Sequence, residues 1–275
     1  MEKLDRLGWA AGLNLVAYGV RIGIRTNRPE ILERAASVMP PGCTRAAGRV
    51  ADRILSLTVG GRDSNRNVRR FHLLYSDALP LARTHDLDEV FALLEDHVKL
   101  YVAETAPRLV FVHAGAVAWR GRAIVLPGLS YSGKSTLVAA LVKAGATYYS
   151  DEYAVLDARG RVHPFPCALQ ERTETGTRAV PPTALGGAPG ARPLPVGLVA
   201  VAAYAPHVSW RPRRLSPGRG ILELLAHTVP ARVRPKDALG ALRSAVFAAP
   251  VLKGQRGEAV ETAAALLRTL DAMDD

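Results

Sequence analysis

Cysteines and long apolar runs are scarce in this sequence of 275 residues. The two cysteines, Cys43 and Cys167, lie far apart and match no metal-ligand spacing, so neither a disulfide framework nor a cysteine metal site is expected. No run of about 18 or more uninterrupted apolar residues occurs, which argues against a membrane-spanning helix. The amino terminus carries charges of both signs and lacks the basic-then-apolar order of a secretory signal. These absences favour a cytoplasmic protein with no membrane partner.

Lysine is also rare, and the positive charge of the chain comes mainly from arginine. The net charge is +11 at pH 7, with only six lysines among the 36 basic residues. An excess of arginine can mark a surface for nucleic acid or acidic peptides, because guanidinium pairs bidentately with phosphate and carboxylate. Here the arginines are spread along the whole chain and form no long block, which is typical of a solvated surface. We therefore expect no nucleic-acid partner.

The hydrophobic pattern predicts an α/β protein with two regions, residues 1–105 and 106–275. In the first region we expect a strand pair at 13–26, a helix at 30–38 with Asn27 as its N-cap, strands at 54–59 and 70–75, and a helix at 88–104. In the second we expect buried strands at 109–112, 123–126, 146–149, 153–156 and 198–203, and helices at 135–144, 216–225, 235–247 and 258–271. The stretch 176–195, rich in proline and glycine, predicts a mobile loop.

One motif in the second region carries a recognisable chemistry. Residues 128–135 read Gly-Leu-Ser-Tyr-Ser-Gly-Lys-Ser and fit the phosphate-loop pattern G-x-x-x-x-G-K-[ST] at every fixed position. The two glycines permit backbone angles that point successive N–H groups at phosphate oxygens. A predicted strand precedes the loop and a predicted helix follows it, as the motif requires. We therefore predict that a nucleoside triphosphate binds to Gly128, Ser130, Tyr131, Ser132, Gly133, Lys134, Ser135 and Thr136.

A pair of carboxylates follows the predicted strand 146–149. Asp151 and Glu152 come only 17 residues after Lys134, which would place them at the carboxyl end of a neighbouring parallel strand, beside the phosphates. One carboxylate there can hold Mg²⁺, and another can accept a proton from an attacking hydroxyl. The structural alternative is that Ser150, Asp151 and Glu152 only cap a turn.

Three blocks of sequence around the loop occur in the order that is found in a known family. They are Val-His-Ala-Gly-Ala-Val at 112–117, the phosphate loop at 128–136, and Ala-Gly-Ala-Thr-Tyr-Tyr-Ser-Asp-Glu at 144–152. They are similar to the His-Gly segment, the G-x-S-x-x-G-K-S loop and the R-G-H-x-x-x-A-D-D block of the bacterial HPr kinase/phosphorylase family. The region 108–157 thus resembles this family, with a looser likeness through the C-terminal helices.

The resemblance implies a P-loop kinase core with a mixed sheet, which uses ATP and Mg²⁺ to phosphorylate a hydroxyl, usually serine, of a peptide or protein. Carried over by position, Asp151 would be the base that takes the hydroxyl proton, with Lys134 on the phosphates. Ser135 and Glu152 would serve Mg²⁺, and His113 would lie near the transferred phosphate. A lone histidine beside a strand is, as an alternative, a structural hydrogen-bonding residue.

One departure from the family narrows the expected activity. The segment 169–176 matches the family's Glu-x-Arg-Gly block poorly, so we expect neither the reverse phosphorylase reaction nor HPr itself as substrate. The sequence looks more like divergent kinases of this family that accompany biosynthetic clusters for ribosomally made peptides, including lasso peptides. Residues 1–105 are then predicted to recognise the substrate. A homo-oligomer is a further possibility, because HPr kinases proper are hexameric.

Two other functions fit the same motif. Sugar and shikimate kinases also place an aspartate after the phosphate-loop helix, so a small-molecule kinase is one alternative. A nucleotide-gated binding module without catalysis is the other. For either kinase, an arginine is expected to stabilise charge on the transferring phosphoryl group. The candidates are Arg172, Arg211, Arg213, Arg214 and Arg219.

Overall fold

The computed structural model describes residues 8–48, 50–63, 68–128, 132–173 and 176–273. It divides into two compact units, Met1–Pro107 and Arg108–Asp275. Both units combine a mixed β-sheet with helices, which confirms the predicted α/β class. Within the described residues, no helix combines the length and the apolar character needed to span a bilayer.

The first unit is built on a six-stranded sheet in the order β3-β1-β2-β4-β7-β8. Strands β2 and β4 are parallel, and the other neighbours are antiparallel. The strands of the sheet are β1 (Ala11–Ala17), β2 (Val20–Thr26), β3 (Thr44–Arg45), β4 (Arg53–Thr58), β7 (His72–Ser76) and β8 (Leu79–Thr84). The two-residue strands β5 (Arg62–Asp63) and β6 (Val68–Arg69) pair separately.

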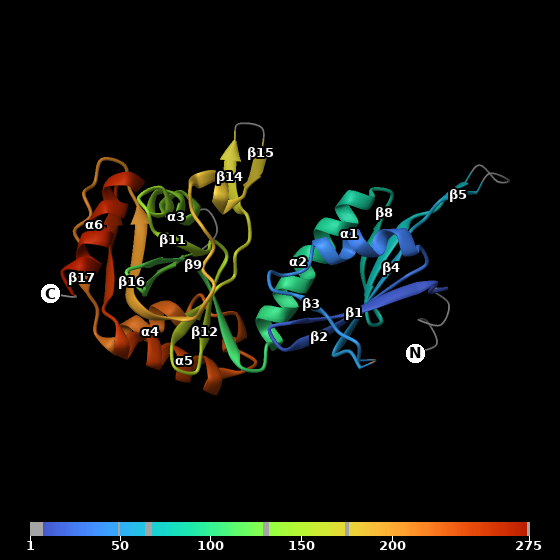
Figure 1. The fold of residues 1–275 in the computed structure, drawn as a ribbon, viewed down its shortest axis with the longest axis horizontal. Helices are drawn as coiled ribbons and strands as arrows, with labels where there is room; N and C mark the ends of the chain where they lie inside the picture. Colours follow the sequence, from blue (N-terminus) through green and yellow to red (C-terminus); the bar gives the residue numbers. More distant parts are fainter. Residues whose placement is uncertain (1–7, 49, 64–67, 129–131, 174–175, 274–275) are drawn as a thin grey trace. The chain divides into compact units, whose positions relative to one another are not determined.

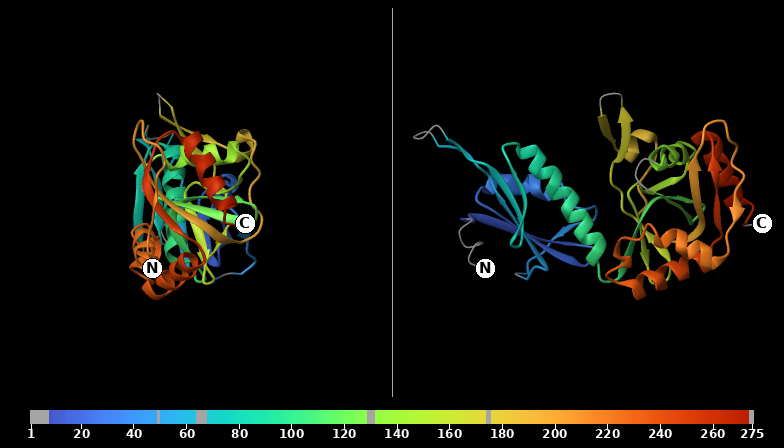
Figure 2. Two further views of the ribbon diagram at one scale, coloured as in Figure 1. Left: turned by 90° about the vertical axis from the view of Figure 1, so that its left-hand side faces the viewer. Right: turned by 180° about the vertical axis from the view of Figure 1, so that it is seen from behind.

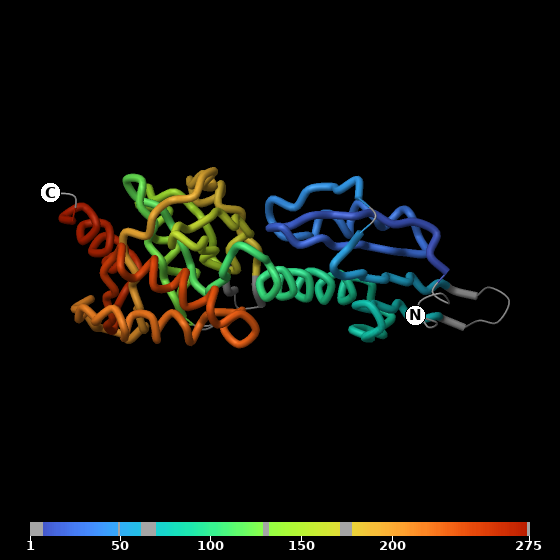
Figure 3. The backbone as a smooth tube through the Cα atoms, turned by 90° about the horizontal axis from the view of Figure 1, so that it is seen from below, coloured from blue at the N-terminus to red at the C-terminus, as the bar shows by residue number. Residues whose placement is uncertain are grey.

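Helix α2 (Leu87–Thr105) lies along this sheet (Figure 3) and contributes fully buried side chains such as Leu94 and Val98. The Asp86 carboxylate begins the helix by accepting hydrogen bonds from the N–H groups of Asp88 and Glu89, at 2.8 and 3.4 Å. Thus the predicted helix at 88–104 forms, and its N-cap lies just before it. The unpredicted edge strand β8 contacts the same helix.

The shorter helix of this unit differs from expectation. A 3-10 turn at Pro29–Ile31 precedes α1 (Leu32–Ser37), and Asn27 does not cap it. The Asn27 side chain instead exchanges two hydrogen bonds with the backbone of Val59, at 2.8 and 3.0 Å. The prediction of an Asn27 cap was therefore wrong, because this amide joins the ends of two parallel strands.

The second unit contains an eight-stranded sheet with the path β10-β9-β12-β13-β16-β18-β17, in which β11 pairs with β9 and β10 also pairs with β16. The pairs β10–β16 and β16–β18 are parallel, and the others are antiparallel. The strands are β9 (Leu109–Trp119), β10 (Arg122–Pro127), β11 (Thr147–Ser150), β12 (Tyr153–Asp157), β13 (Arg161–His163), β16 (Leu194–Tyr204), β17 (Arg213–Arg214) and β18 (Val251–Arg256). A separate hairpin comprises β14 (Leu169–Thr173) and β15 (Gly176–Val180).

Two pairs of helices cover the two faces of this sheet (Figures 1 and 2). They are α3 (Lys134–Lys143) with α6 (Ala259–Asp271), and α4 (Pro217–Leu225) with α5 (Pro235–Ala248). Successive strand residues alternate between the two cores. Val117 and Ile124 pack with the α3 and α6 side chains, whereas Ala116 and Val125 pack with those of α4 and α5.

Two sequence predictions for this unit need correction, and some elements were not predicted. The predicted strand 109–112 is only the first part of β9, which continues to Trp119. The stretch 176–195 is not one loop, because it contains β15, a 3-10 turn at Pro182–Leu185 and the start of β16. A strand, β18, separates the last two helices. Short 3-10 turns such as Val229–Ala231 also went unpredicted.

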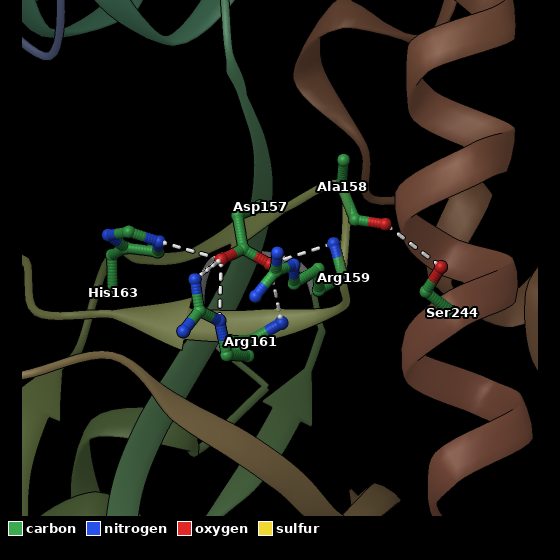
Figure 4. Close-up of polar contacts among 6 residues, drawn as sticks. All are labelled: Asp157, Ala158, Arg159, Arg161, His163 and Ser244. Carbon is green, nitrogen blue, oxygen red and sulfur yellow. Dashed lines mark hydrogen bonds and ion pairs between the residues drawn. The ribbon is translucent and has the colours of Figure 1, made fainter.

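A polar cluster fixes the turn between β12 and β13 (Figure 4). The Asp157 carboxylate accepts hydrogen bonds from the backbone and side chain of Arg161, from the backbone of Arg159 and from His163, at 2.8 to 3.2 Å. Burial raises the pKa of Asp157, but these hydrogen bonds outweigh it and hold the pKa below its ordinary value. The Ser244 hydroxyl on α5 donates to the Ala158 carbonyl at 3.0 Å and so joins the turn to the helix.

Candidate active site

The phosphate loop lies between β10 and α3, as the sequence predicts. Gly133 has φ of 81° and immediately precedes the first helical residue, so it adopts the left-handed conformation that glycine favours. The Lys134 ammonium donates to the Gly128 carbonyl at 2.9 Å, which holds the lysine across the loop. Ser130 and Tyr131, predicted to bind phosphate, lie outside the described residues.

The polar side chains of the loop have different surroundings. The Ser132 hydroxyl is buried and has no hydrogen-bond partner among the described residues. A side chain at Gly128 would come within 2.8 Å of that hydroxyl, so this glycine leaves room for it. Thr136 is exposed on the first turn of α3, and Ser135 is half-buried there. These hydroxyl groups belong to the loop and the first turn of α3, and the N–H groups at such a helix start suit an anion.

The two carboxylates lie in the bend between β11 and β12. The buried Ser150 hydroxyl accepts hydrogen bonds from the N–H groups of Glu152 and Tyr153, at 3.1 and 2.9 Å. The Ser150 hydroxyl therefore fixes this turn, as the structural alternative proposed for the segment 150–152.

Asp151 has an unusual environment for a carboxylate. Burial raises its pKa to about 6, against lowering effects of a hydrogen bond from the Ser135 hydroxyl, the charge of Lys134 and a hydrogen bond from the Gln170 backbone. Its Oδ1 atom is buried without a hydrogen-bond partner among the described residues. Thus Asp151 contacts the phosphate loop directly and keeps one oxygen uncommitted.

Strand β9 brings the loop and the carboxylates together. The sequence predicted the carboxylates at the carboxyl end of a parallel strand that neighbours the strand before the loop. Instead, β9 lies between β10 and β11 and runs antiparallel to both. Strands β10 and β11 therefore point the same way, and their carboxyl ends meet at one edge. At this edge Gly128 N–H donates to the His113 carbonyl at 3.4 Å, and Ala114 N–H donates to the Glu152 carbonyl at 3.3 Å.

Two histidines lie in this cluster, and the sequence identified only one. His113 N–H donates to the His227 carbonyl at 2.8 Å, and the His113 ring lies 4.7 Å from that of Tyr153. Partial burial, then the charges of Lys134 and the other histidine, lowers the pKa of His113. Burial and the charge of Lys134 also lower the pKa of His227. Both rings therefore favour the neutral form.

Sequence reasoning missed the arginine that contacts the phosphate loop. Arg256, at the end of β18, is 3 % exposed and donates to the Gly133 carbonyl at 2.8 Å. Four of the arginines proposed from sequence are exposed, and the side chain of the fifth, Arg172, lies outside the described part of the structure. The four exposed ones are Arg211, Arg213, Arg214 and Arg219. No motif marks Arg256, because its contact depends on strand pairing across 123 residues.

The donor atoms near the loop suit a hard cation that also binds phosphates. The Ser135 hydroxyl contacts Asp151, and the charge of Glu152 acts on the same carboxylate. No group of three or more His, Cys, Asp or Glu side chains with metal-binding geometry occurs among the described residues. Mg²⁺ is commonly held by one or two carboxylates together with substrate phosphates, and the oxygens of Ser135, Asp151 and Glu152 fit that manner of binding.

The fold and the site together define an α/β protein in which a phosphate loop faces a buried carboxylate. No protein-family model matches the chain, and no curated protein matches it either. Among solved structures, the chain is similar to the Hpr(Ser) kinase/phosphatase from Coxiella burnetii, with 14 % sequence identity and a TM-score of 0.32. The aligned part covers 60 % of this chain and 97 % of that one. This likeness is distant, and the chemistry of the site follows from its own residues.

Proposed function

We propose that this chain is an ATP-dependent kinase that transfers the γ-phosphate to a serine or other hydroxyl of a peptide or protein. The observation that carries the proposal is the buried Asp151, which accepts a hydrogen bond from Ser135 of the phosphate loop and has a pKa of about 6. A pKa near neutrality suits a group that must take up a proton and release it in each turnover.

Nucleotide binding would use the loop and its lysine. The N–H groups at the start of α3 would donate to phosphate oxygens, and the positive end of the helix would favour their charge. Lys134 now donates to the Gly128 carbonyl, and its Nζ atom would turn to the β and γ phosphates. Burial lowers the pKa of Lys134, while the nearby Asp151 raises it.

Phosphoryl transfer would proceed by attack of the acceptor hydroxyl on the γ-phosphorus. The new O–P bond forms as the bond between the γ-phosphorus and the β–γ bridging oxygen breaks, and ADP leaves. The proton of the hydroxyl passes to an oxygen of Asp151. His113 and His227, both favouring the neutral form, would offer hydrogen bonds beside the phosphates without adding a charge that competes with Lys134.

Mg²⁺ would supply neutralisation of phosphate charge at this site. The protein atoms suited to hold it are the Ser135 hydroxyl and the Glu152 carboxylate, as the sequence suggested. The hydrogen bond between Ser135 and Asp151 makes the Asp151 carboxylate a further candidate. The two acidic residues would then share the positioning of substrate and cation.

The sequence resemblance supports a peptide as the acceptor, in particular a precursor of a ribosomally made peptide. The test is incubation of the protein with γ-labelled ATP, Mg²⁺ and the peptides encoded by neighbouring genes, followed by mass spectrometry for an added phosphate. We expect a phosphorylated serine with the wild-type protein. Lys134→Ala should lose nucleotide binding and transfer together, whereas Asp151→Asn should retain ATP binding and lose transfer.

A matched control is Asp237→Asn, which changes an exposed carboxylate of α5 whose ion pair with Arg234 spans 3.7 Å. This variant should phosphorylate the peptide at the wild-type rate. If the γ-phosphate is transferred only to a small alcohol, the protein is a small-molecule kinase instead. ATP binding with no transfer to peptides or metabolites would assign a binding module and refute the kinase.

A separate measurement tests the proposal that Asp151 is the base and Glu152 a ligand of Mg²⁺. Glu152→Gln should raise the Mg²⁺ concentration required for half-maximal activity, while Asp151→Asn should lower turnover at saturating Mg²⁺. The opposite pattern would exchange the two roles and make Glu152 the base.

A further inference from the structure

Two residues beyond the phosphate loop are placed to contact a part of the nucleotide that the loop does not. Strands β10, β16 and β18 run parallel in that order, and Val125 is in register with Val199. Strand β16 then continues past the end of β10 to Tyr204, whose register partner on β18 is Arg256. Both residues therefore lie level with the phosphate loop rather than within the sheet core.

The Arg256 side chain is held in place by two backbone carbonyl groups. Its Nη2 donates to the Gly133 carbonyl and its Nη1 to the Gly257 carbonyl, each at 2.8 Å. A side chain at Gly133 would come within 2.5 Å of Nη2, so only glycine permits this approach. The Nε atom is buried with no hydrogen-bond partner among the described residues. The guanidinium is therefore fixed by the backbone at the base of the loop.

Tyr204 lies over this guanidinium. The Cζ atom of Arg256 is 5.2 Å from the centroid of the Tyr204 ring, a cation–π arrangement. The Tyr204 hydroxyl donates to Glu258 at 3.3 Å, which fixes the far end of the ring. The residue nevertheless remains 52 % exposed. An aromatic ring that is oriented by two contacts and still exposed to solvent is suited to stacking against a planar ligand.

The position of Asp151 indicates which part of a bound nucleotide would contact the Tyr204 ring. Asp151 follows β11, which is separated from β10 by β9, whereas Tyr204 ends β16 on the opposite side of β10. A triphosphate that directs its γ-phosphate towards Asp151 must direct its nucleoside away from it. The side away from Asp151 is the side of β16 and β18.

We propose that the base of the bound nucleotide stacks on Tyr204, with Arg256 orienting the ring, so that these residues form the nucleoside side of the site. This inference rests on the proposed function, since it requires a nucleotide in the phosphate loop. Stacking contacts the face of a base and not its hydrogen-bonding edge. ATP and GTP should therefore bind with similar affinity, and the purine ring should add affinity beyond that of the phosphates.

The test compares ATP with inorganic tripolyphosphate, which has the phosphates but no base, by calorimetric titration of the full chain with Mg²⁺. Wild type should bind ATP more tightly than tripolyphosphate. Tyr204→Ala should weaken ATP binding by roughly tenfold and leave tripolyphosphate binding unchanged. Tyr204→Phe, which keeps the ring, should resemble wild type.

Phe247→Ala is the matched control. Phe247 is 67 % exposed on α5, and its ring centroid lies 5.7 Å from Cζ of Arg243. It is therefore also an exposed aromatic ring beside an arginine, but it belongs to another element and is distant from the loop in the sequence. This variant should bind both ligands as wild type does.

Each contrary result has a distinct meaning. Equal affinity of wild type for ATP and tripolyphosphate would overturn the stacking inference and leave the kinase proposal standing. An equal loss of both ligands in Tyr204→Ala would make Tyr204 a support of the loop, which also overturns stacking. Failure of wild type to bind either ligand would overturn the kinase proposal itself.

Discussion

Asp151 is the residue whose chemistry depends most on its surroundings. Its ordinary pKa of 3.8 rises to about 6 because the carboxylate is buried. If Asp151 is the base, kcat/KM for the peptide should rise with pH through about 6 as the carboxylate ionises, and then level off. The measurement is a pH–rate profile with ATP saturating. A profile that is flat between pH 5 and 7 would exclude Asp151 as the base, because a base with a pKa of about 6 changes its ionisation over this range.

The thermal stability of Asp151→Asn shows whether a loss of activity in this variant is chemical or comes from unfolding. A folded pKa above the unfolded one means that the fold favours the protonated carboxyl. That contribution is complete below the ordinary pKa of 3.8 and is lost as the pH rises through about 6. At pH 7.5 the ionised group opposes folding, so Asp151→Asn should unfold thermally at or above the wild-type temperature. Inactivity without destabilisation would then be chemical in origin.

Residues differ in how far the sequence could identify them. Lys134, Ser135 and Asp151 could be proposed as site residues because short-range spacing around a turn and a helix start marks them. His227 and Arg256 carry no such signal. Their proximity to Lys134 and Gly133 arises only when distant strands pair, and an isolated histidine or arginine among 30 arginines has no distinguishing pattern.

At the scale of elements, long periodic segments were predictable and short or exposed strands were not. Helix α2 and helix α3 have clear apolar periodicity and formed where expected. Strand β18 reads Val-Leu-Lys-Gly-Gln-Arg, which alternates poorly, and its strand state comes from pairing with β16 and β17. The order of the strands around β9 likewise depends on tertiary pairing, which no local pattern records.

The turn between β12 and β13 allows a prediction about stability. Gly160 has φ of +72°, and a side chain there would come within 2.4 Å of the Ala245 backbone nitrogen on α5. Gly160→Ala should lower the free energy of unfolding by roughly 3 kcal/mol, from the left-handed backbone and the clash together. Denaturant unfolding measures the change.

Gly186→Ala separates the two causes of that loss. Gly186 has φ of +78°, but nothing lies within 4 Å of the position its side chain would occupy. This variant should lose only about 1 kcal/mol, from the backbone conformation alone. Equal losses in the two variants would show that an added side chain at position 160 does not clash with α5.

At the scale of the whole molecule, the two compact units predict separable functions. Residues 108–275 contain the phosphate loop, both carboxylates and two hydrophobic cores of their own. A fragment of these residues should fold and should gain thermal stability with ATP and Mg²⁺, as the full chain should. If residues 1–107 recognise the peptide, the fragment should have a much higher KM for the peptide. An unchanged KM would place peptide recognition in the second unit.

The hydrogen bond between Arg256 and Gly133 has a consequence for how the protein matures during synthesis. The phosphate loop leaves the ribosome long before its arginine, which follows 123 residues later. Strand β16 must also be made before it can lie between β10 and β18. Such long-range pairing is slow relative to local helix formation. A nascent chain that ends before β18 would therefore contain the whole phosphate-loop motif but lack the hydrogen bond from Arg256 to Gly133. Such a chain should not bind nucleotide, and nucleotide binding should begin only after Arg256 has been synthesised.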